Sequence, residues 1–140
     1  MYNVIKIVPT MLYIFIGIIS LIMAFKCLFS TKFLPFHEAA YGKSWENVEK
    51  NLQYILIALL KISGLGFLTV TILLLTSPIA NYFEPTLYLK FGIPMIALIF
   101  CTGLFIVNLK LFRQTHVKTP WKNSLFIMFV IVLSILISII

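Results

Sequence analysis

Four long stretches with almost no charge constrain this chain more than any other feature. Residues 7–25, 91–109 and 124–140 contain no charged side chain, and residues 52–75 contain only Lys61. A helix needs roughly 20 apolar residues to cross a bilayer core about 30 Å thick. With 61% hydrophobic and 11% charged residues, the composition is far from that of a water-soluble domain. The sequence therefore predicts an all-α integral membrane protein.

The four spans and their connections account for the whole chain. The spans are expected at about residues 7–29, 52–76, 87–110 and 122–140. Short connections favour a four-helix, up-down-up-down transmembrane bundle. The longest polar stretch, residues 30–51, is too short to hold a core of its own. Residues 1–140 are therefore expected to form a single transmembrane domain.

The basic residues predict the orientation in the membrane. Eight of them flank the first and third connections: Lys26, Lys32, Lys43, Lys50, Lys110, Arg113, Lys118 and Lys122. The opposite side carries Lys6 and Lys90. Since Lys and Arg are retained in the cytoplasm, connections 30–51 and 110–122 are expected there, with both termini outside. The net charge of +7 thus indicates a multi-pass protein of a cell membrane, such as a bacterial inner membrane, and no nucleic-acid partner.

Prolines and helix-capping residues suggest where the helices begin and end. A short surface helix is expected over residues 37–41, and the second long helix is expected to begin near Trp45. Ser77-Pro78 is expected to stop that helix near Thr76. Pro85 is well placed to open the third long helix, and Pro94 is expected to kink it.

Lys61 is the residue that stands out chemically. Counting from a membrane boundary at residues 51–54, it would lie roughly 10–15 Å inside the bilayer at 1.5 Å per residue. Ala58 and Gly64, three residues to either side, favour an inward orientation. Ser20, Thr102 and Ser134 could lie near the same depth on the other spans and complete a ligand-binding group with Lys61.

Three interpretations of Lys61 stay open. It could bind an anion, a lipid headgroup or a substrate inside the bundle, or contact an acid of a partner subunit. It could also be an ordinary lysine that snorkels to the cytoplasmic interface. An ion pair with Glu38, folded inward from the first connection, is a further possibility, because the spans themselves contain no acid.

The remaining polar residues give little support to catalysis. His37, Glu38 and His116 could be drawn as a two-histidine, one-carboxylate metal site, although nothing in the sequence fixes these loops against each other. Together with Trp45 they are better interpreted as interfacial loop residues. Cys27 and Cys101 form no C-x-x-C pair, and no nucleophile or phosphate-loop motif is present. We expect no metal, no cofactor and no catalytic residue.

One segment resembles a known group of proteins. The run Phe33-Leu34-Pro35-Phe36-His37, followed by Gly42 and Trp45, is similar to a segment of small uncharacterised bacterial four-span membrane proteins with an F-x-P-[FY]-H and G-x-x-W pattern. In those proteins an apolar helix with one basic residue and paired glycines follows, as Lys61, Gly64 and Gly66 do here. The overall layout is loosely DoxX-like. The resemblance implies a four-helix membrane fold and no particular activity.

The sequence thus favours a non-catalytic role over an enzyme. The first expectation is a small accessory or scaffold subunit that associates with a larger membrane complex or with itself, within the lipid bilayer. The alternative is a small transporter or a lipid- or anion-binding protein that uses Lys61 inside the bundle.

Overall fold

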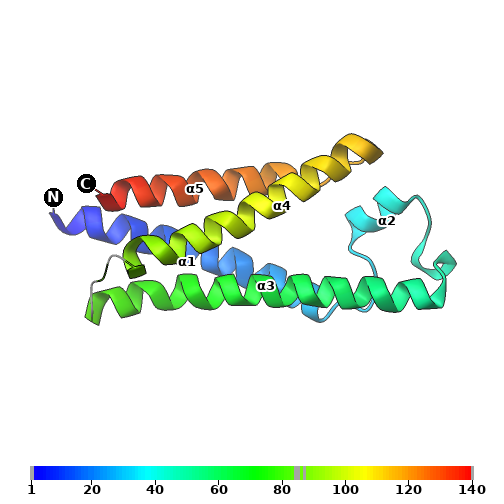
Figure 1. Ribbon diagram of the computed structural model, residues 1–140, viewed down its shortest axis with the longest axis horizontal. Helices are drawn as coiled ribbons and strands as arrows, with labels where there is room; N and C mark the ends of the chain where they lie inside the picture. The colour runs from blue at the N-terminus through cyan, green and yellow to red at the C-terminus, as the bar shows by residue number, and fades with distance from the viewer. Residues whose placement is uncertain (1, 84–85, 87, 140) are drawn as a thin grey trace.

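The computed structural model describes residues 2–83, 86 and 88–139, and within that part of the chain it is all-helical with no strand. The elements are α1 (Tyr2–Leu28), α2 (Pro35–Tyr41), a 3-10 turn η1 (Trp45–Asn47), α3 (Lys50–Phe83), a π-helical turn η2 (Tyr88–Gly92), α4 (Ile93–Thr115) and α5 (Trp121–Ile139). Figure 1 shows the four long helices side by side, with both termini at one end and α2 at the other. All four are long and apolar enough to cross a membrane, as predicted. The short helix expected at residues 37–41 is present as α2.

The expected break at Ser77-Pro78 is wrong, because α3 continues as one helix to Phe83. Pro78 removes one hydrogen bond of the helix and disfavours helical geometry at the preceding residue. Tertiary contacts nevertheless surround this turn: Ser77 is buried, and its hydroxyl donates a hydrogen bond of 3.2 Å to the carbonyl of Leu89 in η2. The helix also begins later than expected, at Lys50, because Trp45 belongs to the separate turn η1.

Pro94 lies in the first turn of α4. A proline is tolerated there because the first turn of a helix has no partner for its amide groups. The π-helical turn η2 lies just before it, so the irregular backbone precedes the proline, and the kink expected at Pro94 stays a prediction. Pro85 lies outside the described residues.

Close packing of α1 against α3 sets their antiparallel register. A Cβ added at Gly17 would lie 2.7 Å from a Leu75 methyl, and one added at Gly64 would lie 2.8 Å from Leu28. The last residue of α1 therefore lies beside Gly64. Residues 50–61 of α3 extend past the end of α1, over roughly 18 Å at 1.5 Å per residue.

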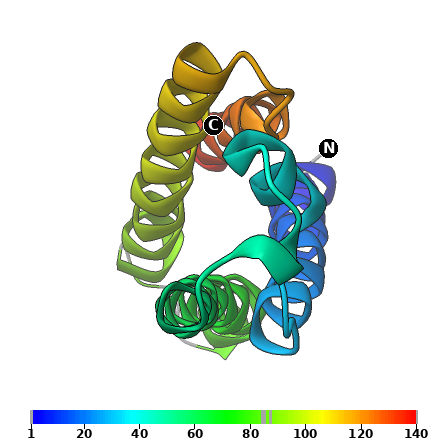
Figure 2. The same ribbon diagram turned by 90° about the vertical axis from the view of Figure 1, so that its right-hand side faces the viewer.

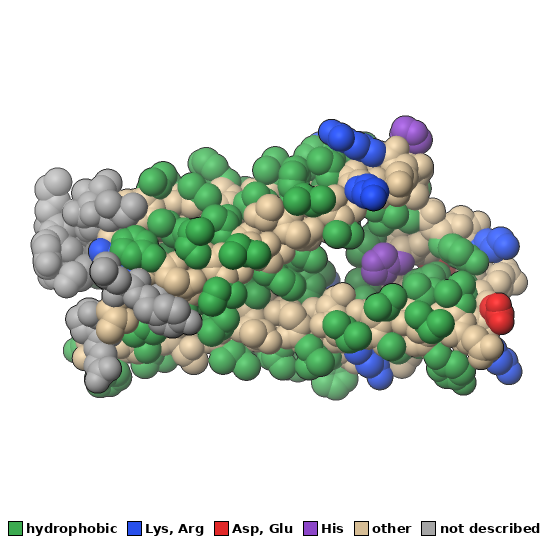
Figure 3. Space-filling model, viewed as in Figure 1, with side chains coloured by type: hydrophobic (Ala, Val, Ile, Leu, Met, Phe, Trp, Pro, Cys, Tyr) green, Lys and Arg blue, Asp and Glu red, His purple; other side chains and the backbone are tan. Residues whose placement is uncertain are grey.

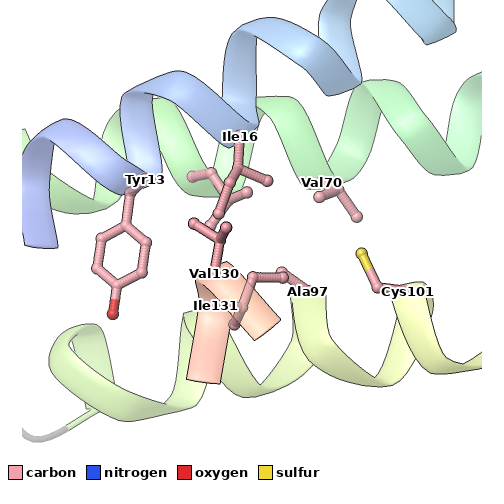
Figure 4. Packing of buried hydrophobic residues seen from close by; sticks show 8 residues of the cluster. Tyr13, Ile16, Val70, Ala97, Cys101, Val130 and Ile131 are labelled. Atoms are coloured by element: carbon pink, nitrogen blue, oxygen red, sulfur yellow. The ribbon is translucent and has the colours of Figure 1, made fainter. Parts of the chain in front are cut away.

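The buried core lies where all four long helices meet. Each contributes two of its residues: Tyr13 and Ile16, Val70 and Leu74, Ala97 and Cys101, and Val130 and Ile131. Figure 4 shows these side chains converging between the helices. The core therefore lies closer to the end of the structure with the two termini than to the end with α2.

Toward the α2 end, α4 diverges from α3. The two helices are in contact where Phe67 meets Phe100 edge to face, with ring centroids 5.2 Å apart, and Gly66 faces the same ring. Beyond that point Figure 1 shows α4 turning away toward its connection with α5. Viewed from this end, α1, α3, α4 and α5 form a ring with α2 lying over one side of it (Figure 2).

Candidate functional site

Lys61 is exposed, contrary to the inward orientation expected from its small neighbours. A helix turns by about 100° per residue, so residues 7 and 11 positions away share its stripe. Two of those residues, Tyr54 and Ile72, are 72% and 54% exposed. Gly64 lies on the adjacent stripe, which packs on α1. Gly64 thus marks the α1 contact, whereas Ala58 is exposed, and Lys61 lies beside that contact on the outer surface.

The packing of α1 against α3 also fixes the level of Lys61 along the structure. It precedes Gly64 by three residues, and Gly64 lies beside Leu28 at the end of α1. Lys61 is therefore about 4.5 Å beyond the end of α1. Lys61 therefore lies toward the end of the structure that carries the two basic connections.

The three hydroxyl residues expected near Lys61 are engaged elsewhere. Ser20 donates to the carbonyl of Phe67 at 2.8 Å, and Thr102 donates to Leu98 of its own helix at 2.8 Å. Ser134 bonds to Pro9 at 3.5 Å, near the opposite end of α1 from Lys61. Each hydroxyl satisfies a helix carbonyl, and the structure does not bring the four residues into one site.

His37 and His116 occupy different surroundings. His37 lies half-buried in α2, with its ring centroid 4.0 Å from that of Phe36. His116 ends α4 in the left-handed conformation, with φ of 56°, and is exposed. Among the described side chains, no three His, Cys, Asp or Glu residues gather closely enough to hold a metal ion.

A lateral groove of about 510 Å³ lies between α3 and the first connection. We call it the α2–α3 groove. One wall is formed by α3 through Leu52, Leu56, Ile57, Leu59, Leu60 and Ser63. The other is formed by Lys32, Phe33, His37, Ala40, Tyr41 and Trp45. Leu111 of α4 completes the lining, and Figure 3 shows the hollow between the ends of α3 and α4.

The groove arises because α3 is longer than its neighbours. Leu52, Leu56 and Ser63 recur at helical spacing, and the same stripe continues into the bundle as Val70 and Leu74. Within the bundle this stripe is covered by the other long helices. Past the end of α1, where α4 has diverged, α2 and the first connection are its main covering. The groove is thus the continuation of the core, left partly open.

An aromatic cluster stabilises the wall that the first connection forms, which we call the outer wall. Phe33 packs against Trp45 with centroids 4.7 Å apart, and against Tyr41 and His37 at 6.0 and 6.2 Å. The amide of Gln53 on α3 donates to the carbonyls of Trp45 and Val48 at 2.8 and 3.1 Å, which ties the connection to the helix. The wall is therefore built largely of rings and is tied to α3 at the carboxyl-terminal end of the connection.

The groove is apolar with one charge. Lys32 is the only charged residue among the described lining residues, and no carboxylate lines the groove. His37 also contributes to the wall, and burial lowers its pKa from the ordinary value of 6.5. The imidazole is therefore mostly neutral at pH 7. A long apolar molecule with a negative or polar end fits this combination.

Sequence reasoning identified His37 and Trp45 as notable but not the groove that they line. The available signal was the expected extent of the second long helix, from near Trp45 to near Thr76, which exceeds the roughly 20 residues needed for a span. The leucine spacing at its amino-terminal part was a second signal. Neither reveals that α1 ends beside Gly64, which only the packing of the two helices determines.

No protein-family model, curated protein or solved structure matches the chain.

Proposed function

We propose that this chain is a multi-pass membrane protein that binds a membrane lipid in the α2–α3 groove without chemical conversion. The four apolar helices would cross the bilayer in an up-down-up-down order. Both basic connections lie at one end of the structure and both termini at the other (Figure 1), which supports the cytoplasmic placement of the connections. The exposed apolar side chains of all four helices would then face lipid tails.

The observation that carries the lipid-binding proposal is the α2–α3 groove itself. The groove continues the stripe of α3 that is buried further along the helix. It lies at the end of the structure where α3 meets the first connection. A groove at that level opens toward acyl chains on one side and headgroups on the other. Lys61, exposed near the same level, would reach headgroups from the outer surface rather than bind a ligand inside the bundle.

A groove-filling substitution tests the proposal. Ser63→Phe places a ring in the groove, whereas Ile62→Phe, one residue away, places it on the outer surface, where Ile62 is 64% exposed. Protein purified in mild detergent is examined by native mass spectrometry. We expect co-purified lipid on the parent and on Ile62→Phe, and its loss from Ser63→Phe.

A second filling variant, Ala40→Leu on the opposite wall, guards against misfolding of the first. Circular dichroism and elution volume identify variants that retain the fold. Equal lipid retention by the parent and by both folded filling variants would contradict the proposal.

A second candidate is the accessory or scaffold role, favoured by the outer side of residues 50–61. Tyr54 and Ile55 are exposed there beyond the end of α1. An apolar surface at that position suits a partner helix. Co-purification with a defined partner that is lost in Ile55→Glu, but kept in Ser63→Phe, would support this role.

A further inference from the structure

We infer that the α2–α3 groove selects a phospholipid with an anionic headgroup, whose phosphate is held at Lys32. This inference rests on the proposed lipid binding and names the class of lipid. The occupant is thus a membrane lipid with one acyl chain along the α3 wall and its polar end at the start of the first connection.

The acyl chain alone cannot explain selection. Lipid tails are as apolar as leucine, so a chain that moves from the bilayer into the groove exchanges one apolar environment for another. The leucines of the α3 wall, Leu52, Leu56 and Leu60, offer no polar group that would distinguish one acyl chain from another. Discrimination between lipids must therefore come from the polar end of the groove.

At that end the charge is unopposed. Lys32 lines the groove, and in the described part of the structure no acid forms an ion pair with it. The hydroxyl of Ser30 donates to the carbonyl of Lys32 at 2.6 Å, which fixes the backbone that presents the side chain. The neighbouring His37 contributes a half-buried imidazole and no second full charge at neutral pH. Complementarity is thus to a headgroup with one net negative charge, that is, a phosphate diester without the quaternary ammonium group that makes phosphatidylcholine neutral overall.

Trp45 allows the occupant to be observed directly. It lines the groove, and the only other tryptophan, Trp121, lies on α5 against Phe105 and Phe112. In a Trp121→Phe background, acyl chains brominated near the middle quench Trp45 when they occupy the groove. The protein is reconstituted in phosphatidylcholine vesicles that contain equal fractions of brominated phosphatidylglycerol or brominated phosphatidylcholine.

We expect brominated phosphatidylglycerol to quench Trp45 with an apparent association about fivefold higher than that of phosphatidylcholine, as one basic residue beside an anionic surface contributes. Lys32→Gln should bring the ratio to about one. Lys61→Gln is the matched control, because Lys61 lies on the outer stripe of α3 and does not line the groove. It should leave the ratio unchanged.

Two outcomes overturn the inference and differ from failure of the proposed function. If the parent shows a ratio of about one and Ser63→Phe abolishes the quenching, the proposed lipid binding stands but the inferred headgroup selection is wrong. A preference that Lys32→Gln and Lys61→Gln lower equally assigns selection to the general positive surface. If Ser63→Phe does not change the quenching, Trp45 reports only surrounding lipid, and the proposed function itself fails.

Discussion

At the scale of single residues, Gly64 sets how closely α1 and α3 approach. A Cβ there would lie 2.8 Å from Leu28 and 3.0 Å from the Cβ of Cys27, and Cys27 can move only with its backbone. Gly64→Ala should therefore lower thermal stability despite the gain in helix propensity. Overpacking costs about 1–3 kcal/mol, and the propensity gain of about 1 kcal/mol only partly offsets it.

Gly103 offers the matched control for this substitution. It is exposed on α4, and a Cβ added there meets nothing within 4 Å. Gly103→Ala should leave the unfolding temperature unchanged or raise it slightly. Unfolding in detergent can be followed with a thiol-reactive dye, because Cys27 and Cys101 are both buried. Equal effects at the two glycines would show that the α1–α3 contact is looser than described.

His37 predicts a pH dependence confined to the outer wall of the groove. Burial lowers its pKa in the packed state below the ordinary 6.5, so the packed state binds fewer protons than the unpacked state. The packing of α2 is then fully stable above pH 6.5 and weakens as the pH falls below that value. Lys32 on the same wall and the adjacent Glu38 are the nearby charged groups.

Trp45 emission in the Trp121→Phe background measures this effect, because Trp45 packs on Phe33 of the same wall. Between pH 7.5 and 5 the emission should shift to the red as the ring becomes more exposed to water. His37→Gln removes the titrating group and should remove the shift. A shift that persists in His37→Gln would assign it to another group.

At the scale of elements, α3 shows what the sequence could and could not predict. Its apolar character was evident, and so was the short helix before it, but its bounds at Lys50 and Phe83 were not. Its path through Ser77-Pro78 was not, because the hydrogen bond from Ser77 to Leu89 and the burial of Ser77 depend on where η2 lies. The orientation of Lys61 was missed for a similar reason. Small residues on a helix indicate that one of its faces packs closely. Only the position of the neighbouring helix shows whether Lys61 lies within that face or beside it.

The hydrogen bond between Ser77 and η2 can be tested by substitution. Ser77→Ala leaves the carbonyl of Leu89 without that hydroxyl and should cost about 1–2 kcal/mol of stability. Thr76→Ala is the adjacent control, because Thr76 is exposed and bonds only to Ile72 of its own helix. It should have little effect. Thermal unfolding compares the two, and an equal loss would remove the special role of Ser77.

At the scale of the whole molecule, the proposed orientation predicts which residues are accessible from outside a cell. Tyr82 is 84% exposed at the end of α3 that lies near the termini, and Lys43 lies in the first connection. A membrane-impermeant maleimide should label Tyr82→Cys in intact cells and label Lys43→Cys only after permeabilisation. Labelling of Lys43→Cys alone would invert the orientation, and labelling of both in intact cells would contradict insertion.

The sequence indicated the four long helices and the position of both basic connections at one end, but not the groove. Composition reports how many residues need an apolar environment and hence the number of spans. The groove depends on where one helix stops beside another, and on the divergence of α4 from α3 (Figure 2). The resemblance of residues 30–70 to small bacterial four-span proteins stays a prediction, and it covers the same segment that forms most of the groove.

Mapping a photoreactive phospholipid onto the chain is the measurement that tests the central claim most directly. A phosphatidylglycerol with a diazirine in its acyl chain is incorporated with the protein in vesicles, irradiated, and located by peptide mass spectrometry. The account predicts cross-links concentrated on the α2–α3 groove, at the α3 wall and at the residues of the first connection that face it, and lost in Ser63→Phe. Cross-links spread evenly over the outer faces of the four long helices, and unchanged in Ser63→Phe, would contradict it.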